Sequence, residues 1–220
     1  MARQKNMQRR RTILRNTFSL LRQDGLKNVS LQMIADESEI SKSLLQSYYP
    51  HKSKLMNEIV TSFMSTILKV VNSEKFANVS VYAKMKLFIY ILLELGERDE
   101  GISRLLNNVL KSDDSLEKWG QLLDSWLIEE GVKDELGTDH QIKIGLNFIV
   151  SGGGSIFLKQ KELQVTPEEI SDIMVKTFMS TFLDYPDVKT KEALEQGNKI
   201  IENFDMDKVF EAINTMFTEK

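Results

Sequence analysis

The stretch SLQMIADESEISKSLLQSYYPHKSKL, residues 30–55, decides the fold, because it contains two short amphipathic helices separated by a tight break. Ser30 is a good helix N-cap, and the apolar residues that follow it recur at helical spacing. Ser41 can cap a second helix, whose apolar side chains share one face. Two helices joined by so short a turn cross steeply, which is the geometry of a helix-turn-helix.

The second of these helices presents a polar face opposite its apolar one. The side chains of this face are hydrogen-bonding groups of a size that can reach base edges in a DNA groove. They are Lys42, Ser43, Gln46 and Ser47. This pattern predicts a recognition helix. The alternative is an ordinary helical corner, and these residues alone do not choose between the two.

The charge is unevenly distributed along the chain. Residues 1–70 contain 12 Lys and Arg against 5 Asp and Glu, whereas the remaining residues contain 17 against 27. A basic part that coincides with the helix-turn-helix is what binding to phosphates requires, and this coincidence outweighs the alternative of a solvated charged face. Residues 1–8, with Arg3 and Lys5, are expected to form a mobile basic arm that can lie along DNA.

The first quarter of the chain resembles TetR-family transcriptional regulators. The positions that match the family pattern, in register, are Gly25, Ser30, Ile34, Ala35, Ile40, Ser41, Lys42, Leu45, Tyr48, Tyr49, Lys52 and Leu55. The resemblance implies double-stranded operator DNA as the partner. It implies that Ser30, Ser41 and Lys52 contact phosphates and that the polar face of the second helix, with Lys42, Ser43, Gln46 and Ser47, lies toward the groove.

Three residues differ from the family pattern. Glu39 replaces a glycine of the turn, and a side chain there costs about 1 kcal/mol if the backbone is left-handed. Ser43 also replaces a glycine and adds a hydroxyl near the DNA. Gln46 replaces a tyrosine that reaches a phosphate, and its amide can instead pair with an adenine edge.

The rest of the chain predicts an all-α protein, since no stretch shows the alternation of a strand. Long helices are expected over residues 9–24, 52–73, 116–130, 141–161 and 168–183 and from the cap Ser80 to a last turn at residues 94–97, with a shorter one over 102–110. We expect a helix-turn-helix domain over residues 1–55, including the arm, a larger effector-binding and dimerisation domain over residues 56–184, and a C-terminal helical extension over residues 185–220.

Three consecutive glycines, Gly152 to Gly154, fall inside the most apolar predicted helix. Each costs up to about 1 kcal/mol relative to alanine, so a close helix-helix approach or a kink is expected. By the resemblance, the helices over 141–161 and 168–183 form a four-helix bundle with a second subunit. The candidate interface residues are Phe148, Ile156, Phe178 and Phe182, which can alternatively belong to the core.

The resemblance also implies a small-molecule effector bound in the larger domain. An apolar and aromatic lining would suit an apolar or aromatic molecule. The candidate pocket residues are Phe63, Ile67, Tyr82, Met85, Phe88, Leu106, Leu110, Trp119, Leu123, Trp126 and Phe148. The alternative for each of them is plain core packing.

No pattern in the sequence indicates an enzyme. There is no cysteine, and the only histidines, His51 and His140, have no further ligand at metal-binding spacing. Walker, dinucleotide-binding and nucleophile-elbow motifs are absent. We therefore expect no catalytic residue, no metal and no cofactor. Without a signal peptide or a long apolar run, a cytoplasmic location without membrane association is expected.

These observations lead to the hypothesis of a homodimeric, sequence-specific DNA-binding transcriptional regulator, a repressor that a small-molecule effector releases from a palindromic operator. The alternative is an all-helical small-molecule-binding or scaffold protein that has lost specific DNA binding, which Glu39, Gln46 and the acidic larger domain suggest. A binder of nucleic acid without sequence preference is the third hypothesis.

Overall fold

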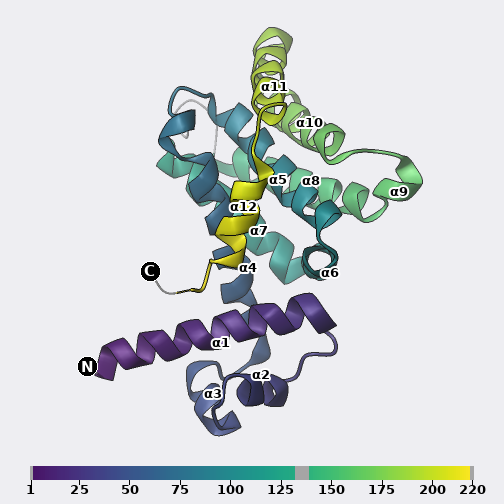
Figure 1. Ribbon diagram of the computed structural model, residues 1–220. Coiled ribbons are helices and arrows are strands. Elements are labelled where there is room, and N and C mark those ends of the chain that lie inside the picture. The colour runs from purple at the N-terminus through teal and green to yellow at the C-terminus, as the bar shows by residue number, and fades with distance from the viewer. Residues whose placement is uncertain (1, 132–138, 219–220) are drawn as a thin grey trace.

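The computed structural model describes the backbone of residues 2–131 and 139–218, and every regular element in these ranges is helical (Figure 1). The all-α class is thereby confirmed. The longer helices are α1 (Ala2–Asp24), α4 (Lys52–Val71), α5 (Val81–Arg98), α6 (Glu100–Val109), α7 (Asp113–Glu129), α8 (Asp139–Leu158), α10 (Pro167–Thr177) and α11 (Asp187–Ile201). The shorter elements are α2 (Leu31–Glu37), α3 (Lys42–Tyr48), α9 (Gln160–Leu163), α12 (Met206–Asn214), a 3-10 turn (Glu74–Phe76) and a π-helical turn (Phe178–Phe182).

The helix-turn-helix forms through the two expected caps. The Ser30 hydroxyl accepts a hydrogen bond from Met33 N at 3.1 Å, and the Ser41 hydroxyl accepts one from Leu44 N at 3.2 Å. Between the two helices, Glu39 has φ of 52°, the left-handed conformation that costs a side chain about 1 kcal/mol. The tight turn is therefore kept although its glycine is replaced.

The first helix begins earlier than the sequence pattern indicated. Residues 2–8, expected to be a mobile arm, belong to α1. They lack apolar periodicity, but alanine, arginine, glutamine, lysine and methionine are all strong helix formers. The side chain of Asn6 also accepts a hydrogen bond from the Tyr48 hydroxyl, which ties this end of α1 to α3.

Apart from α4, the N-terminal helices are attached to the body by a joint between α1 and α6. In Figure 1, α1 runs beneath the body with α2 and α3 on its far side, while α4 rises into the body. At the joint, the Arg22 guanidinium pairs with Asp99 at 2.5 Å and donates to Asn214 Oδ1 at 2.8 Å. Gly101 lies so close that a Cβ there would be 2.8 Å from the Arg22 carbonyl oxygen. The C-terminal helix α12 thus contributes directly to the joint.

In the body, α5 packs against α10 and α11, and α8 packs between α7 and α10. Lys86 on α5 is fully buried and pairs with Asp172 on α10 at 2.5 Å. A Cβ on Gly153 would be 2.2 Å from Met174 Sδ, and one on Gly154 would be 2.9 Å from Leu110 Cδ2. The close approach expected at the glycine run is therefore found at these two positions.

Two expected long helices end sooner than their apolar pattern indicated. The helix predicted over 141–161 stops at Leu158 and is followed by α9, and the one predicted over 168–183 changes at Phe178 into the π-helical turn. The apolar spacing continues through both changes, so periodicity could not show them. No helix in the described ranges is long and apolar enough to cross a membrane.

Candidate nucleic-acid interface

The outer face of α3 consists of the four predicted polar residues. Lys42, Ser43, Gln46 and Ser47 are all exposed, whereas Leu45 on the opposite face is fully buried. The Ser47 hydroxyl donates to the Leu44 carbonyl at 2.7 Å, but no side-chain partner is found for the other three among the described residues. This face can therefore offer an ammonium group, a hydroxyl and an amide to a ligand.

Ser30 and Ser41 lie at the N-termini of α2 and α3 and are both exposed. Each hydroxyl oxygen already accepts a capping hydrogen bond, which leaves its O–H free to donate. A phosphate at these helix ends would also meet unpaired backbone N–H groups and the positive end of the helix dipole. The geometry is compatible with the phosphate contacts that the resemblance implies.

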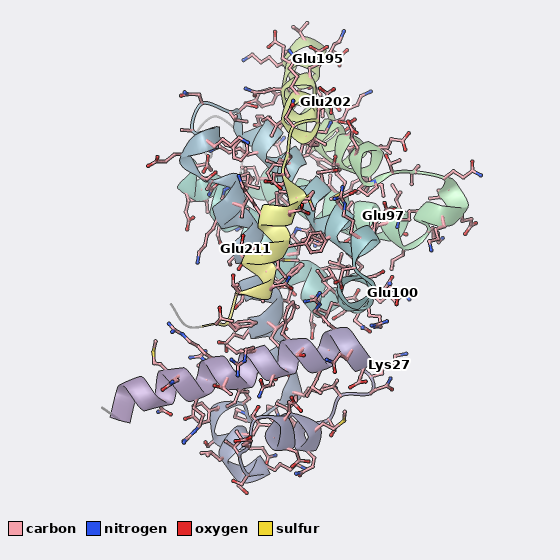
Figure 2. All side chains as sticks on the ribbon, in the orientation of Figure 1. Lys27, Glu97, Glu100, Glu195, Glu202 and Glu211 are labelled. Atoms are coloured by element: carbon pink, nitrogen blue, oxygen red, sulfur yellow. The ribbon has the colours of Figure 1, made fainter. Side chains whose placement is uncertain are left out.

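Basic side chains of α1 extend the positive surface. Arg9, Arg11 and Arg15 are exposed, and none of them forms an ion pair with the residues that the structure describes. Acidic residues are instead spread over the body: Figure 2 labels Glu97, Glu195, Glu202 and Glu211 there. The charge asymmetry of the sequence is thus also an asymmetry between the two ends of the molecule.

Arg10 has a different role from its exposed neighbours. Its guanidinium binds both carboxylate oxygens of Glu58, at 3.0 and 2.8 Å, and donates to the Tyr49 hydroxyl at 3.2 Å. These contacts raise the pKa of Arg10 further, and burial raises the pKa of Tyr49 to about 12. The cluster fastens α1 to the end of α3 and to α4. Sequence reasoning missed it, because Glu58 lies 48 residues from Arg10 and no local pattern joins them.

Lys52 is placed differently from the expectation that it projects toward a phosphate. Its ammonium group donates to the carbonyl oxygens of Leu26, at 2.6 Å, and of Val29. Partial burial lowers the pKa of Lys52. In this arrangement Lys52 ties the start of α4 to the turn that precedes α2, and so helps to hold the helix-turn-helix together.

A second exposed surface lies on α8 and α10. Phe148 and Ile144 on α8 are 59% and 47% exposed, and Ile173 on α10 is 44% exposed. The half-buried ring of Phe182 packs against Phe148, with ring centroids 5.4 Å apart. We call the surface formed by Ile144, Phe148, Ile173 and Phe182 the apolar face.

The four candidate interface residues therefore divide between surface and core. Phe148 and Phe182 lie on the apolar face and Ile156 is half-buried, but Phe178 is fully buried against Gly145. Phe178 thus belongs to the core of its own chain. Ile144 was missed, although it precedes Phe148 by one helical turn on the same face of α8.

The candidate pocket residues lie mostly in the core. Phe63, Ile67, Met85, Phe88, Leu106, Leu110, Trp119, Leu123 and Trp126 are all buried. Tyr82 packs edge-on against Tyr185 and lines an open hollow beside α11. Phe148 is on the surface and is therefore wrongly placed in an internal pocket. A different hollow, between α4 and α6–α7, contains none of the eleven residues.

The sequence is similar to curated proteins over about half of its length. It is 23% identical over 112 residues to the nucleoid occlusion factor SlmA of Actinobacillus pleuropneumoniae (serotype 5b), which covers 50% of this chain and 55% of that protein. It is 24% identical over 100 residues to SlmA of Haemophilus ducreyi, covering 45% of this chain and 50% of that protein. The chain thus matches about half the length of these relatives, and no family model matches it.

The fold agrees with solved structures over most of the chain. RolR in complex with resorcinol superposes with a TM-score of 0.55 and 15% identity, covering 87% of this chain and 95% of RolR. RolR without ligand gives a TM-score of 0.59 with 11% identity and covers 85% and 95%. SlmA and RolR are both TetR-family proteins. The resemblance inferred from the helix-turn-helix is thereby confirmed: the chain has the fold of the TetR-family regulators and resembles them in sequence.

Proposed function

We propose that this chain is a sequence-specific DNA-binding transcriptional regulator that acts as a homodimer. It is a repressor, and a small-molecule effector releases it from its operator. One observation carries the proposal. The exposed face of α3 carries Lys42, Ser43 and Gln46, for which no side-chain partner is found among the described residues, and the exposed Arg9, Arg11 and Arg15 of α1 form no ion pair there either. This combination supplies base contacts from one helix and phosphate contacts from its neighbour.

The roles within the interface differ between residues. Gln46 reads a base edge, because its amide can pair with the donor and acceptor of adenine. Lys42 binds a guanine edge or a phosphate, and Ser30 and Ser41 donate to phosphates at the helix ends. Lys52 acts indirectly by holding the start of α4 against the turn before α2.

The apolar face supports the dimer. Large apolar side chains rarely gather at the surface of a monomer unless they contact a partner. On α8 the face continues from Ile144 and Phe148 to the exposed Ser151 and Ser155, and nothing lies within 4 Å of a Cβ built on Gly152. Such small residues allow a second copy of α8 to approach closely. A two-fold dimer would set two α3 helices about one DNA turn apart.

Release from DNA requires the two α3 helices to change their spacing. A ligand causes this change when it binds more tightly to one relative position of the N-terminal helices and the body than to another. Besides the backbone connection through α4, the ends are joined by the cluster of Arg22, Asp99 and Asn214. The ligand of RolR, resorcinol, supports a small molecule as the class of effector.

Salt dependence of binding to a DNA duplex tests the interface directly. The slope of log affinity against log salt falls by about 1 for each phosphate contact that is removed. We expect Arg11→Ala and Arg15→Ala each to lower the slope in this way. Lys69→Ala is the matched control, because Lys69 is also an exposed cation but lies about 25 Å along α4 from its start.

If the control lowers the slope as much as the α1 variants do, the cations of α1 have no special role and the interface is wrongly placed. If the wild-type protein shows no binding at low salt, the proposal of DNA binding itself fails. The alternative of a helical protein that has lost DNA binding would then account for the fold.

A further inference from the structure

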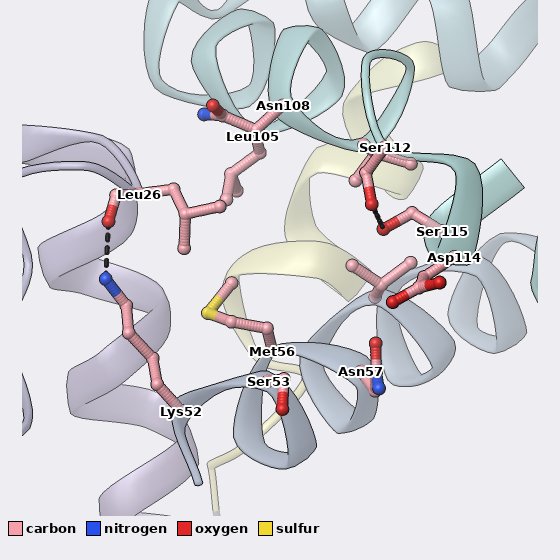
Figure 3. Close-up of a pocket in the computed structure, with 12 residues that line it drawn as sticks. Leu26, Lys52, Ser53, Met56, Asn57, Leu105, Asn108, Ser112, Asp114 and Ser115 are labelled. Atoms are coloured by element: carbon pink, nitrogen blue, oxygen red, sulfur yellow. Dashed lines mark hydrogen bonds between the residues drawn. The ribbon is translucent and has the colours of Figure 1, made fainter.

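A hollow of about 310 Å³ separates the start of α4 from α6 and α7 (Figure 3). One wall comes from the turn between α1 and α2 and from the start of α4, and includes Leu26, Ser53 and Met56. The other comes from the body, and includes Leu105, Asn108 and Asp114. The hollow is therefore lined by both parts of the molecule whose relative position a regulator must change.

The floor of the hollow is apolar. Its apolar lining residues are Leu26, Met56, Val60, Leu105 and Val109. Figure 3 shows Met56 reaching from α4 toward the centre. The volume is at the small end of the range of roughly 300–1,000 Å³ for ligand sites. It equals about ten water molecules at liquid density, so a molecule with a single ring would fill it.

The rim of the hollow is polar and carries one acidic group. Ser112 and Ser115 bond to each other at 3.1 Å, and Asn108 donates to the Arg104 carbonyl at 2.7 Å. The Asp114 carboxylate has no hydrogen bond or ion pair with the residues that the structure describes. Lys52, the cation at the rim, already donates to two carbonyl groups. An uncommitted carboxylate above an apolar floor favours a ligand with a cationic head group.

We propose that this hollow binds a small molecule that has an apolar body of about one ring and a cationic amine, which Asp114 would receive. Because the ligand would touch α4 and Leu26 on one side and α6–α7 on the other, its affinity depends on the distance between them. This regulatory part rests on the proposed DNA-binding function: the ligand and DNA then change each other's affinity by the same factor.

The binding test uses 2-phenylethylamine as the probe and the methyl signals of methionine as the readout. The full chain is labelled at its ten methionine methyl groups, and the Met56 signal is identified by its loss in Met56→Leu. We expect 2-phenylethylamine to shift the Met56 signal selectively. The neutral analogue 2-phenylethanol should bind about fivefold more weakly, as for the loss of an exposed ion pair, and phenylacetate more weakly still.

Two variants make the result specific. Asp114→Asn should remove the preference for the amine over the alcohol, whereas Asp113→Asn is the matched control, since Asp113 is an exposed neighbour that does not line the hollow. Val60→Phe fills the floor and should abolish the Met56 shift with both molecules. Both aspartate changes are at exposed positions, so the fold is retained.

The proposal is overturned if the amine leaves the Met56 signal unchanged, or if Asp114→Asn keeps the preference for the amine. DNA affinity is measured by fluorescence anisotropy on the same samples. Absence of DNA binding in the protein without the amine, together with an intact Met56 shift when the amine is added, would refute the proposed function and leave the ligand site standing. DNA binding without a Met56 shift would refute the ligand site alone.

Discussion

Replacement of Lys52 by methionine separates a structural role from DNA contact. The change keeps the aliphatic stem of the side chain and removes its ammonium group. Two hydrogen bonds from a charged donor are lost, to the carbonyl groups of Leu26 and Val29. Bonds of this kind contribute about 1.5–3 kcal/mol each when buried. Because Lys52 is only partly buried, we expect a total loss of about 1.5–3 kcal/mol.

The assay is urea and thermal unfolding of the full chain. For a protein of this length the expected loss lowers the melting temperature by about 3–12 °C. Lys54→Met is the matched control, because Lys54 is exposed two residues further along α4 and no partner is found for it among the described residues. Its stability should stay within about 0.5 kcal/mol of the wild type.

DNA binding by the Lys52→Met protein completes the test. The salt dependence of its affinity should equal that of the wild type under conditions in which both are folded. A slope lower by about 1, together with unchanged stability, would mean that Lys52 contacts a phosphate. That result would refute the structural role and restore the expectation drawn from the sequence.

Three further predictions concern other parts of the molecule. Phe148→Glu should convert a dimer to a monomer in analytical sedimentation. Val188→Glu, at a position on α11 that is 68% exposed, should leave the dimer intact. A dimer in both variants would exclude the apolar face as the interface. Gly153→Ala should lower the unfolding free energy by about 1–2 kcal/mol, because the added Cβ would clash with Met174. Gly120→Ala should raise it by up to about 1 kcal/mol, because a Cβ there has no other atom within 4 Å. Because the pKa of Tyr49 is raised to about 12, the native phenol keeps a proton that the unfolded chain releases above about pH 10, so stability should fall as pH rises from 10 to 12. The absorbance titration of the native protein should lose its latest phenolate step in Tyr49→Phe, and persistence of that step would show that another tyrosine titrates there.

The helix-turn-helix could be predicted because its signals are local. Each cap and its first turn lie within four residues, and the apolar spacing needs only two turns of helix. The sequence also marked Glu39 as the residue that would carry a cost if the turn were left-handed, and the structure has a φ of 52° there. The resemblance to the TetR family depended on this same stretch.

Other parts of the interface depend on contacts between distant segments. The sequence gives no sign that Arg10 has a partner, but in the fold its guanidinium donates hydrogen bonds to Glu58 and Tyr49. Lys52 lies where the family pattern has a lysine, but its two carbonyl partners come from a turn whose path no pattern gives. Charge alone therefore could not separate the residues that hold the helices together from those that are free to bind.

Apolar patterns have a similar limit in the body. Phe148 and Phe178 both lie on apolar helices, and their spacing gives no reason to treat them differently. The packing of α8 against α10 buries Phe178 on Gly145 and leaves Phe148 exposed. Periodicity shows which face of a helix is apolar, but it does not show whether the same chain or a second one covers that face.

Selection of bound sequences from a pool of random DNA duplexes tests the central claim most directly. The purified protein is used at two salt concentrations, and the selection is repeated with Gln46→Ala. We expect an enriched palindrome whose half-sites lie about one helical turn apart, with one position in each half-site relaxed by Gln46→Ala. A folded dimer that enriches no sequence at either salt concentration would contradict the account.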